Sequence, residues 1–394
     1  MLRVLSLFSG IGAFEKALKN IGKDFELVNY CEIDKYASKA YSMIHNVSED
    51  LNLHDVTKID TSKLHDIDLI TYGFPCQDIS IAGRQRGFTD NKGNRTRSGL
   101  FFEALRIIED TKPKYAIAEN VKALTSKKFE SEFETVLNSL NNAGYTNYYA
   151  VLNAKDYGIP QNRERIFIVS IRNDLNCGLF QFPIKRKLNV LLKDYLEKEV
   201  DDKYYIDNER SRNLINQIVT KNCIIKSTPV DGTIFDPKVK DICNCISARY
   251  DAGIQNQKSI GCMVIEPSKI NRLGNIYGEN MGTSMGGNVY SPEGIMPTLT
   301  TSQGGNRQPL IAESNPITAM NGKAIRKQCE SSKVNDMEFR IRKLTPKECF
   351  RLMGFSDVDF DSIHGISNTQ LYKMAGNSIV VNVLEAIFKN LLEE

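Results

Sequence analysis

A thiol, an acid and two guanidinium groups stand beside predicted strands, where they could carry out nucleophilic chemistry. Cys76 belongs to the segment Gly-Phe-Pro-Cys-Gln at 73–77, which directly follows a predicted strand at 68–72. A side chain just beyond the carboxyl end of a strand lies at the crevice where open α/β sheets bind ligands. A lone cysteine is also often a small buried hydrophobic residue, so Cys76 by itself does not decide between catalysis and packing.

Two later segments supply groups that could assist such a thiol. Glu119 follows a predicted strand at 115–118, and Arg163 and Arg165 stand at the start of a predicted strand that ends at residue 171. Three groups together suit the activation of a planar heterocycle: a thiolate, an acid able to hold or give a proton, and an arginine fork. Taken singly, Glu119 could equally be a structural cap or an ion-pair partner, and the arginines a solvated run of charge.

A glycine-rich turn near the start of the chain is a candidate cofactor loop. Residues 8–12 read Phe-Ser-Gly-Ile-Gly between a predicted strand and a predicted helix, so the backbone could approach a ligand at a helix N-terminus. Glu32 follows the second glycine by twenty residues, the spacing at which an acid can accept hydrogen bonds from ribose hydroxyls. Asp55 and Val56 stand after the next helical segment, and Asp55 could meet an adenine.

Three interpretations of this loop remain open from the residues alone. It could be a tight turn of any α/β domain, or a site for a nicotinamide nucleotide. Glu15 stands where a dinucleotide fingerprint has its third glycine, however. A cofactor without a pyrophosphate, such as S-adenosylmethionine, is more compatible with the absence of that third glycine.

The elements that would position these groups alternate between strand and helix over residues 1–175, which indicates a parallel α/β sheet. Helical character returns after residue 340, where Thr345 is a predicted N-cap and Glu348 closes a capping box. The predicted strands lie at 3–8, 26–32, 68–72, 115–118, 148–152 and 165–171, and the predicted helical stretches at 14–21, 100–108, 133–140 and 379–392.

Composition divides the chain into three parts. Residues 1–184 and 341–394 share the strand-and-helix pattern, whereas residues 185–340 are rich in Gly, Asn, Ser, Thr and Pro with short β-like runs. A loop-rich segment suits recognition rather than scaffolding. We therefore expect a small recognition domain inserted before the last elements of a large domain, a division that the length of 394 residues also favours.

Composition and charge exclude several classes of protein. The chain has 41% hydrophobic and 25% charged residues, and no run approaches the roughly 20 apolar residues of a membrane span. Its nine scattered cysteines, with no Cys-x2-Cys pair, argue against a disulfide framework and a zinc site, so we expect a cytoplasmic protein without a metal. The net charge of +3 permits a nucleic-acid partner without requiring one.

Five segments occur in the order found in bacterial and phage DNA (cytosine-5)-methyltransferases. They are residues 8–12 (FSGIG), 73–77 (GFPCQ), 119–121 (ENV), 161–165 (QNRER) and 375–378 (AGNS). The chain resembles that family over residues 1–175 and 340–394, and its middle resembles the family's target-recognition domain in outline. The resemblance implies an α/β fold with a Rossmann-like S-adenosylmethionine-dependent methyltransferase domain. It also implies a smaller, mostly β or irregular target-recognition domain before the C-terminal elements.

The resemblance further implies roles for single residues. Cys76 would attack carbon 6 of a cytosine, while Glu119 would act on ring N3. Arg165 would bind the ring carbonyl, with Arg163 supporting the loop. S-adenosylmethionine would be held by residues from several segments: Phe8, Gly10, Ile11, Gly12, Glu32, Ile33, Asp55, Val56, Pro75, Leu100 and Asn377. Two positions depart from the family pattern, because an aromatic residue is common in place of Ile33 and a basic one in place of Asn162.

The substrate that the resemblance implies is double-stranded DNA with a cytosine flipped out of the helix. DNA contacts are implied for a loop after the thiol and for two parts of the recognition segment: Ser80, Arg84, Arg86, Arg95, Arg97, Met285, Asn288, Thr300 and Gln303. We expect a monomer in a bacterial cell or a phage-infected bacterium. A cognate restriction endonuclease could accompany it, but we expect neither a membrane nor an obligate protein partner.

Three other functions compete with this interpretation. A nicotinamide-dependent dehydrogenase would need the missing third glycine, and a non-catalytic DNA-binding protein would leave Cys76, Glu119 and the arginines unexplained. A tRNA cytosine-5 methyltransferase of the same family is the nearest alternative. The insertion of about 155 residues favours a double-helical substrate over tRNA.

Overall fold

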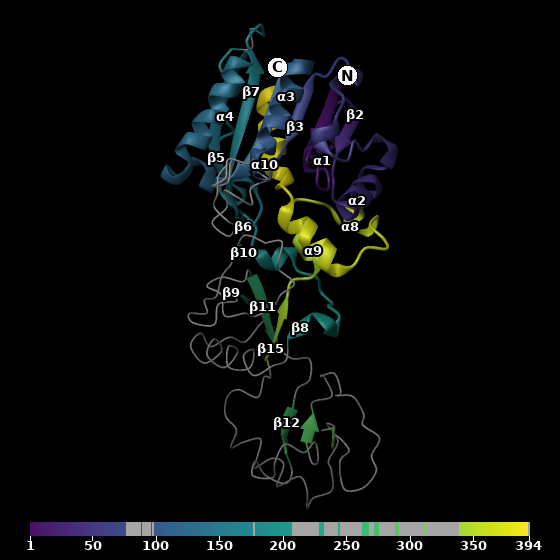
Figure 1. The fold of residues 1–394 in the computed structure, drawn as a ribbon. Helices are drawn as coiled ribbons and strands as arrows, with labels where there is room; N and C mark the ends of the chain where they lie inside the picture. Colours follow the sequence, from purple (N-terminus) through teal and green to yellow (C-terminus); the bar gives the residue numbers. More distant parts are fainter. Residues whose placement is uncertain are drawn as a thin grey trace, which may run out of the picture. The chain divides into compact units, whose positions relative to one another are not determined.

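The chain divides into two compact units. The computed structural model describes residues 1–75, 88, 96, 98–175, 178–206, 228–231, 243–244, 262–267, 272–275, 288–290, 310–311 and 339–392. The larger unit comprises Met1–Glu199, Asp241–Ala252 and Leu344–Glu394, and the smaller comprises Val200–Lys240 and Gly253–Lys343. The two ends of the chain therefore belong to the same unit (Figure 1).

A six-stranded mixed sheet forms the centre of the larger unit. In spatial order its strands are β2 (Phe25–Cys31), β1 (Leu2–Leu7), β3 (Leu69–Tyr72), β4 (Tyr115–Val121), β7 (Glu164–Arg172) and β5 (Tyr145–Asn153). The first four strands run parallel, whereas β7 runs antiparallel to both of its neighbours. The expectation of a wholly parallel sheet was wrong at this strand. Residues 154–163 alone join β5 to β7, and a parallel crossover needs a dozen residues or more.

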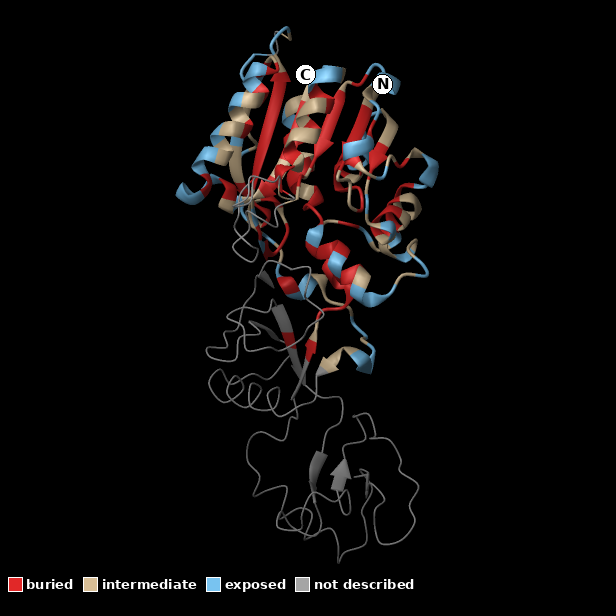
Figure 2. Cartoon of the chain, in the orientation of Figure 1, coloured by how far each residue is buried: buried red, intermediate tan, exposed pale blue. Residues whose placement is uncertain are grey.

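Helices pack on this sheet in two groups. α1 (Ala13–Asn20) packs against α10 (Val381–Leu392), and their Phe14 and Phe388 rings meet edge to face at 6.3 Å. α3 (Phe101–Thr111) and α4 (Glu130–Asn142) share a buried core with alternate residues of β1 and β3, and α2 (Lys35–His45) follows β2. The central strands β1, β3, β4 and β7 are largely buried, the edge strands β2 and β5 are less so, and the helices that cover the sheet keep an exposed side (Figure 2). Such a sandwich places the strand ends, rather than the strand faces, within reach of ligands.

The C-terminal part of the larger unit forms three further short helices: α7 (Pro346–Arg351), α8 (Asp357–Asp361) and α9 (Asn368–Asn377). α7 starts with the predicted capping box. The Thr345 hydroxyl accepts the Glu348 N–H at 3.2 Å, and the Glu348 carboxylate accepts the Thr345 N–H at 2.8 Å. This local prediction is confirmed.

The smaller unit contributes short strands in two sheets. β8 (Tyr205–Ile206), β15 (Phe339–Lys343), β11 (Cys262–Pro267) and β9 (Thr228–Asp231) form one, and β12 (Arg272–Asn275), β13 (Asn288–Tyr290) and β14 (Leu310–Ile311) form the other. β10 (Cys243–Asn244) belongs to the larger unit, where it pairs with β6 (Gln161–Asn162). Within the residues that the structure describes, every helix is too short or too polar to cross a membrane.

Candidate active site

A pocket of about 380 Å³ lies at the carboxyl ends of β1 to β4, within the larger unit. Its volume falls in the range of small-molecule sites. Most of the predicted site residues that the structure describes line it: Glu119, Arg163 and Arg165 for the chemistry, and Phe8, Gly10, Ile11, Glu32, Ile33, Asp55, Val56, Pro75, Leu100 and Asn377 for the cofactor. The fold therefore gathers residues from both ends of the chain around one cavity.

Glu119 and Arg165 form an ion pair in this pocket. Oε1 of Glu119 lies 3.0 Å from Nε of Arg165, and the two side chains are only 12% and 18% exposed. The register of the sheet brings them together, because Val121 at the end of β4 pairs with Arg165 at the start of β7. In antiparallel strands an early residue of one lies beside a late residue of the other. A parallel β7 would place Arg165 at the opposite edge.

The Glu119 carboxyl is suited to hold a proton. Burial raises its pKa above the ordinary glutamate value, although the charges of Arg165 and Arg163 act in the other direction. A Cβ atom added to Gly73 would lie 3.7 Å from Oε2 of Glu119, so the segment that leads to Cys76 passes close to this carboxyl. An acid with a raised pKa can donate a hydrogen bond or a proton to a ring nitrogen.

Arg163 reaches the C-terminal segment. Its side chain is buried, and Nη2 donates to the backbone carbonyls of Gly376 at 3.1 Å and Ser378 at 2.6 Å. These carbonyls flank Asn377, a pocket residue. Arg163 thus holds the pocket wall that the C-terminal segment forms, and its role in the reaction stays a prediction.

Asn120 lines the pocket, although no role was predicted for it. Its buried side-chain amide donates to the carbonyl of Phe74 at 3.0 Å, and its Oδ1 accepts the Val121 N–H at 2.8 Å. The bond to Phe74 fixes the chain two residues before Cys76 against β4. The only sequence signal was the position of Asn120 between two residues of the ENV motif.

Glu32 is hydrogen-bonded to the glycine loop. Its Oε2 accepts the N–H of Gly10 at 2.8 Å, and its Oε1 accepts the N–H of Asp34 at 2.8 Å. Burial raises the pKa of Glu32, against the effect of these backbone hydrogen bonds. A carboxylate oxygen can accept a second hydrogen bond, so both oxygens can still receive hydroxyl groups of a ligand.

Gly12 differs from the other predicted cofactor residues because it does not line the pocket. It caps α1 in the left-handed conformation with φ of 78°, and a Cβ there would lie 2.1 Å from Nε2 of His45. That nitrogen lies 3.1 Å from the carbonyl of Ile11, to which it donates. Burial lowers the pKa of His45 to about 4, so the ring is neutral near pH 7. Gly12 therefore makes room for a histidine that holds the loop.

The side of the pocket where the adenine is predicted to bind combines an exposed apolar side chain with polar groups. Ile33 is 76% exposed and lines the pocket, so a ligand bound there could cover its side chain. Asp55 uses one carboxylate oxygen to accept from the N–H and hydroxyl of Thr57. Phe8 adopts φ of 53°, a strained value for a bulky residue that occurs mainly at functional positions.

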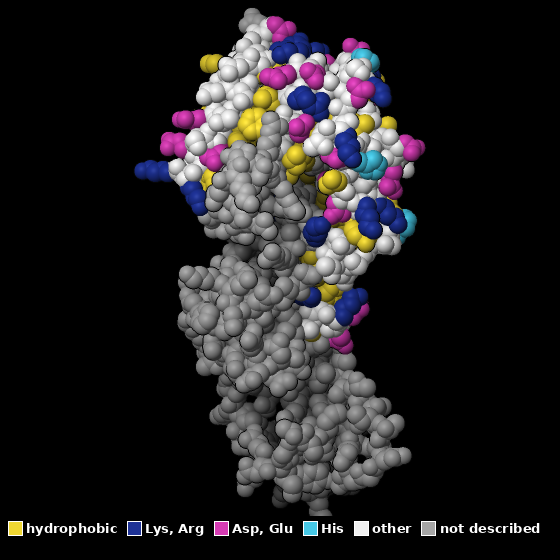
Figure 3. All heavy atoms as spheres, viewed as in Figure 1, with side chains coloured by type: hydrophobic (Ala, Val, Ile, Leu, Met, Phe, Trp, Pro, Cys, Tyr) yellow, Lys and Arg dark blue, Asp and Glu magenta, His cyan; other side chains and the backbone are white. Residues whose placement is uncertain are grey.

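Several predicted residues lie outside those that the structure describes. They include the nucleophile Cys76 and most of the predicted DNA contacts: Ser80, Arg84, Arg86, Arg95, Arg97, Met285, Thr300 and Gln303. The backbone of Asn288 begins β13, but its side chain is not described. On the face drawn in Figure 3, the described Lys and Arg side chains are interspersed with Asp and Glu and form no single basic patch.

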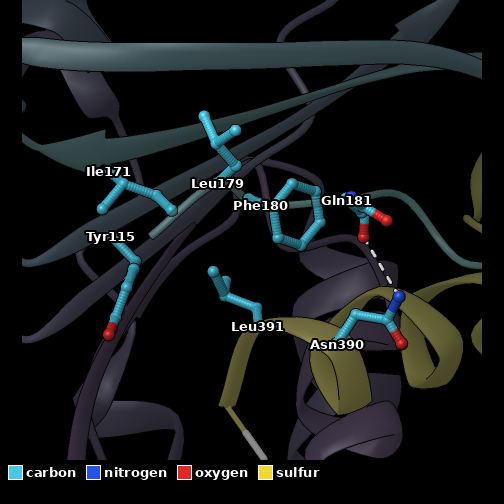
Figure 4. Close-up of a pocket in the computed structure, with 7 residues that line it drawn as sticks. All are labelled: Tyr115, Ile171, Leu179, Phe180, Gln181, Asn390 and Leu391. Atoms are coloured by element: carbon cyan, nitrogen blue, oxygen red, sulfur yellow. Dashed lines mark hydrogen bonds between the residues drawn. The ribbon is translucent and has the colours of Figure 1, made fainter. Parts of the chain in front are cut away.

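A second pocket, of about 290 Å³, contrasts with the first. It is lined by Tyr115, Ile171, Leu179, Phe180, Gln181, Asn390 and Leu391 (Figure 4). Tyr115 starts β4 and Ile171 lies near the end of β7, so this pocket borders the other edge of the sheet. Its lining contains no charged side chain, whereas Glu119, Arg163 and Arg165 line the first pocket.

Comparison with known proteins identifies the family. The family model of C-5 cytosine-specific DNA methylases matches residues 2–393. The chain belongs to this family. It is a DNA (cytosine-5-)-methyltransferase, and enzymes of this family use S-adenosylmethionine. The predicted resemblance is thereby confirmed, and the dehydrogenase and non-catalytic interpretations are excluded.

Individual relatives match over nearly the whole chain. The orphan methyltransferase M.SPBetaI of Bacillus phage SPbeta is 35% identical, with 99% of this chain and 97% of the relative covered. The type II methyltransferase M.HhaI of Haemophilus parahaemolyticus is 33% identical over 99% and 94%. The crystal structure of S. pombe Dnmt2 methyltransferase covers 100% of this chain and 98% of its own at a TM-score of 0.59 and 21% identity, which supports the predicted methyltransferase fold.

Proposed function

We propose that the protein methylates carbon 5 of a cytosine flipped out of a specific short sequence in double-stranded DNA, through a covalent bond between Cys76 and carbon 6. The observation that carries this proposal is the Glu119–Arg165 ion pair. The two side chains lie 3.0 Å apart in a pocket that Pro75, the neighbour of Cys76 in sequence, also lines. Glu32 and the glycine loop stand in the same pocket.

The residues at the cofactor side fit a nucleoside with a charged tail. Glu32 would accept the ribose hydroxyls, and Ile33 would cover one face of the adenine. Asp55 would reach the adenine edge, and Asn377 would complete the pocket. When bound, S-adenosylmethionine supplies a methyl group on a positively charged sulfur, which makes that methyl electrophilic.

Carbon 5 of cytosine must first become electron-rich. The Cys76 thiolate adds to carbon 6, while Glu119 gives a proton or a hydrogen bond to N3 and Arg165 binds the carbonyl oxygen O2. These two contacts limit the charge that develops on the ring. Carbon 5 then accepts the methyl group, loses its proton to a base, and the ring expels the thiolate to restore aromaticity.

A stacked base exposes none of these atoms, so the cytosine must leave the helix at a cost of a few kcal/mol. Arg84, Arg86, Arg95 and Arg97 would contact phosphates, and the recognition segment would read the base edges. We expect a monomer acting in the cytoplasm. M.HhaI and M2.ScrFI carry type II names and M.SPBetaI an orphan name, so a partner endonuclease is optional for this chain as well.

Transfer of tritium from labelled S-adenosylmethionine to duplex DNA and to tRNA tests this proposal. Duplex DNA should be labelled and tRNA should not. Cys76→Ser should bind the methyl donor as tightly as the wild type and label nothing, whereas Cys177→Ser, outside the five motif segments, should behave as the wild type. Preferential labelling of tRNA, or an active Cys76→Ser variant, would overturn the proposal. Bisulfite sequencing of DNA from expressing cells would then give the target sequence.

A further inference from the structure

An ion pair joins two segments that are far apart in the sequence at the edge of the active-site pocket. Nζ of Lys373, on α9, lies 2.6 Å from Oδ2 of Asp34, the residue that caps α2. Both residues line the pocket. Asp34 and Lys373 are 339 positions apart in the chain, so their contact joins an N-terminal and a C-terminal segment of the pocket wall.

Asp34 connects this ion pair to the glycine loop. Its N–H donates to Oε1 of Glu32 at 2.8 Å, and Oε2 of Glu32 accepts the N–H of Gly10 at 2.8 Å. The other carboxylate oxygen of Asp34, Oδ1, accepts the N–H groups of Tyr36 and Ala37 at the start of α2. The Asp34 carboxylate thus caps α2 and contacts α9, while the backbone N–H of Asp34 donates a hydrogen bond to Glu32.

Lys373 belongs to a helix that forms one wall of the pocket. Met374, Gly376 and Asn377 of α9 line the cavity beside it. The end of α9 is held from inside by the buried Arg163, which donates to the carbonyls of Gly376 and Ser378. On the solvent side the Lys373–Asp34 pair is half-exposed, with 46% and 27% of the two side chains accessible. The wall is therefore held at two points, one buried and one reached by water.

We propose that Lys373 and Asp34 act as a clasp that keeps α9 against the methyl-donor side of the pocket. The two are positioning residues: they act through Glu32 and through α9 on how tightly the donor is held, and they leave the chemistry at Glu119 and Arg165 unchanged. This inference rests on the proposed function in one respect, that the pocket holds S-adenosylmethionine.

The partial exposure of the Lys373–Asp34 pair limits how much its loss can change the affinity for the methyl donor. Half-exposed ion pairs stabilise structures by about 0.2–1 kcal/mol, which corresponds to at most about a fivefold change in a dissociation constant. Salt screens such a pair. Breaking the clasp should therefore raise the Kd and KM for S-adenosylmethionine by up to about fivefold at low ionic strength, with kcat unchanged and a smaller effect at high salt.

The test is a double-mutant cycle on donor binding, measured by calorimetry on the full chain without DNA. Lys373→Met keeps the length of the side chain without its charge, and Asp34→Asn keeps an oxygen to cap α2. The ligands are S-adenosylmethionine and S-adenosylhomocysteine. Lys347→Met is the matched control, because Lys347 also pairs with an aspartate, Asp361 at 2.8 Å, but does not line the pocket.

The clasp predicts that each single variant weakens binding and that the double variant binds no more weakly than either single one. Lys373→Arg should restore binding, and Lys347→Met should bind as the wild type. If Lys373→Met weakens binding while Asp34→Asn does not, Lys373 contacts the donor directly and the clasp is wrong. Unchanged binding in both variants also overturns the clasp alone. A wild-type protein that binds neither ligand would overturn the assignment of the pocket as well.

Discussion

β4 and β7 lie side by side in the sheet, and a pocket borders each end of the pair. At one end, the polar end, the pocket holds the Glu119–Arg165 ion pair. At the other end, the uncharged end, Tyr115 and Ile171 border a cavity whose lining contains no charged side chain. The same two strands therefore offer a charged environment at one end and an uncharged one at the other. The comparison teaches that the chemistry depends on the edge where the parallel strands end, and that the reversed direction of β7 delivers an arginine to that edge.

The strongest test of the claim that the chemistry takes place at the polar end is to remove the acid there. Glu119→Gln should lower kcat by about 10²–10⁴-fold, because the amide cannot give a proton to the ring nitrogen. Donor binding, measured by calorimetry, should not change. Methylation of duplex DNA within tenfold of the wild-type rate would show that the polar end does not act through this carboxyl.

The same substitution should alter how stability depends on pH. Since burial raises the pKa of Glu119 in the folded state, the folded protein holds a proton that the unfolded chain has already released. Stability therefore falls as pH rises from the ordinary glutamate value, about 4.3, to the raised one. In urea unfolding across this range, Glu119→Gln should lose less stability with rising pH than the wild type. Equal pH slopes for the two proteins would mean that the carboxyl has an ordinary pKa.

Asn120→Ala should have an intermediate effect at the polar end. It leaves the buried carbonyl of Phe74 without its 3.0 Å donor, which costs about 1–3 kcal/mol of stability and loosens the chain before Cys76. We expect kcat to fall about tenfold while KM for the donor stays constant. Asn20→Ala, which removes an exposed bond to Glu385, is the matched control and should change stability by less than about 0.5 kcal/mol. A kcat equal to that of the control would refute the positioning role.

The smallest effect is expected at the uncharged end. Leu179 is 84% exposed, so Leu179→Ser should change the free energy of unfolding by less than about 0.5 kcal/mol. Methylation rate and donor affinity should match the wild type. A loss of activity without a loss of stability would show that the second pocket also takes part in the reaction.

Many elements of the larger unit could be predicted because their signals are local, although α8 and α9 were not among those predicted. The alternation of apolar residues fixes the strands, and Thr345 and Glu348 mark the start of α7 within three residues of each other. The candidate site was also accessible in outline, since the motif residues at strand ends converge in any fold of this class. The comparisons confirm the family, whereas the roles of single residues stay predictions.

Direction and long-range contacts could not be predicted from local signals. The reversal of β7 depends on the short connection after β5. The alternation of apolar residues that predicts a strand does not indicate the direction in which the strand runs. Asn120 bonds to Phe74, 46 residues away, and Lys373 pairs with Asp34, 339 residues away. Neither contact can be predicted from the residues next to it in the sequence. The closeness of Gly12 to His45 of α2, 33 residues away, is likewise not indicated by the residues around either of them.

The central claim is that the sulfur of Cys76 reacts beside Glu119 and Arg165. It is tested most directly by incubating the protein and S-adenosylmethionine with a random-sequence duplex in which 5-fluorocytosine replaces cytosine, followed by peptide mapping of the trapped complex by mass spectrometry. The account predicts a DNA adduct on the peptide that contains Cys76, absent in Cys76→Ser and formed more slowly in Glu119→Gln. An adduct on any other residue, or one that persists in Cys76→Ser, would contradict it.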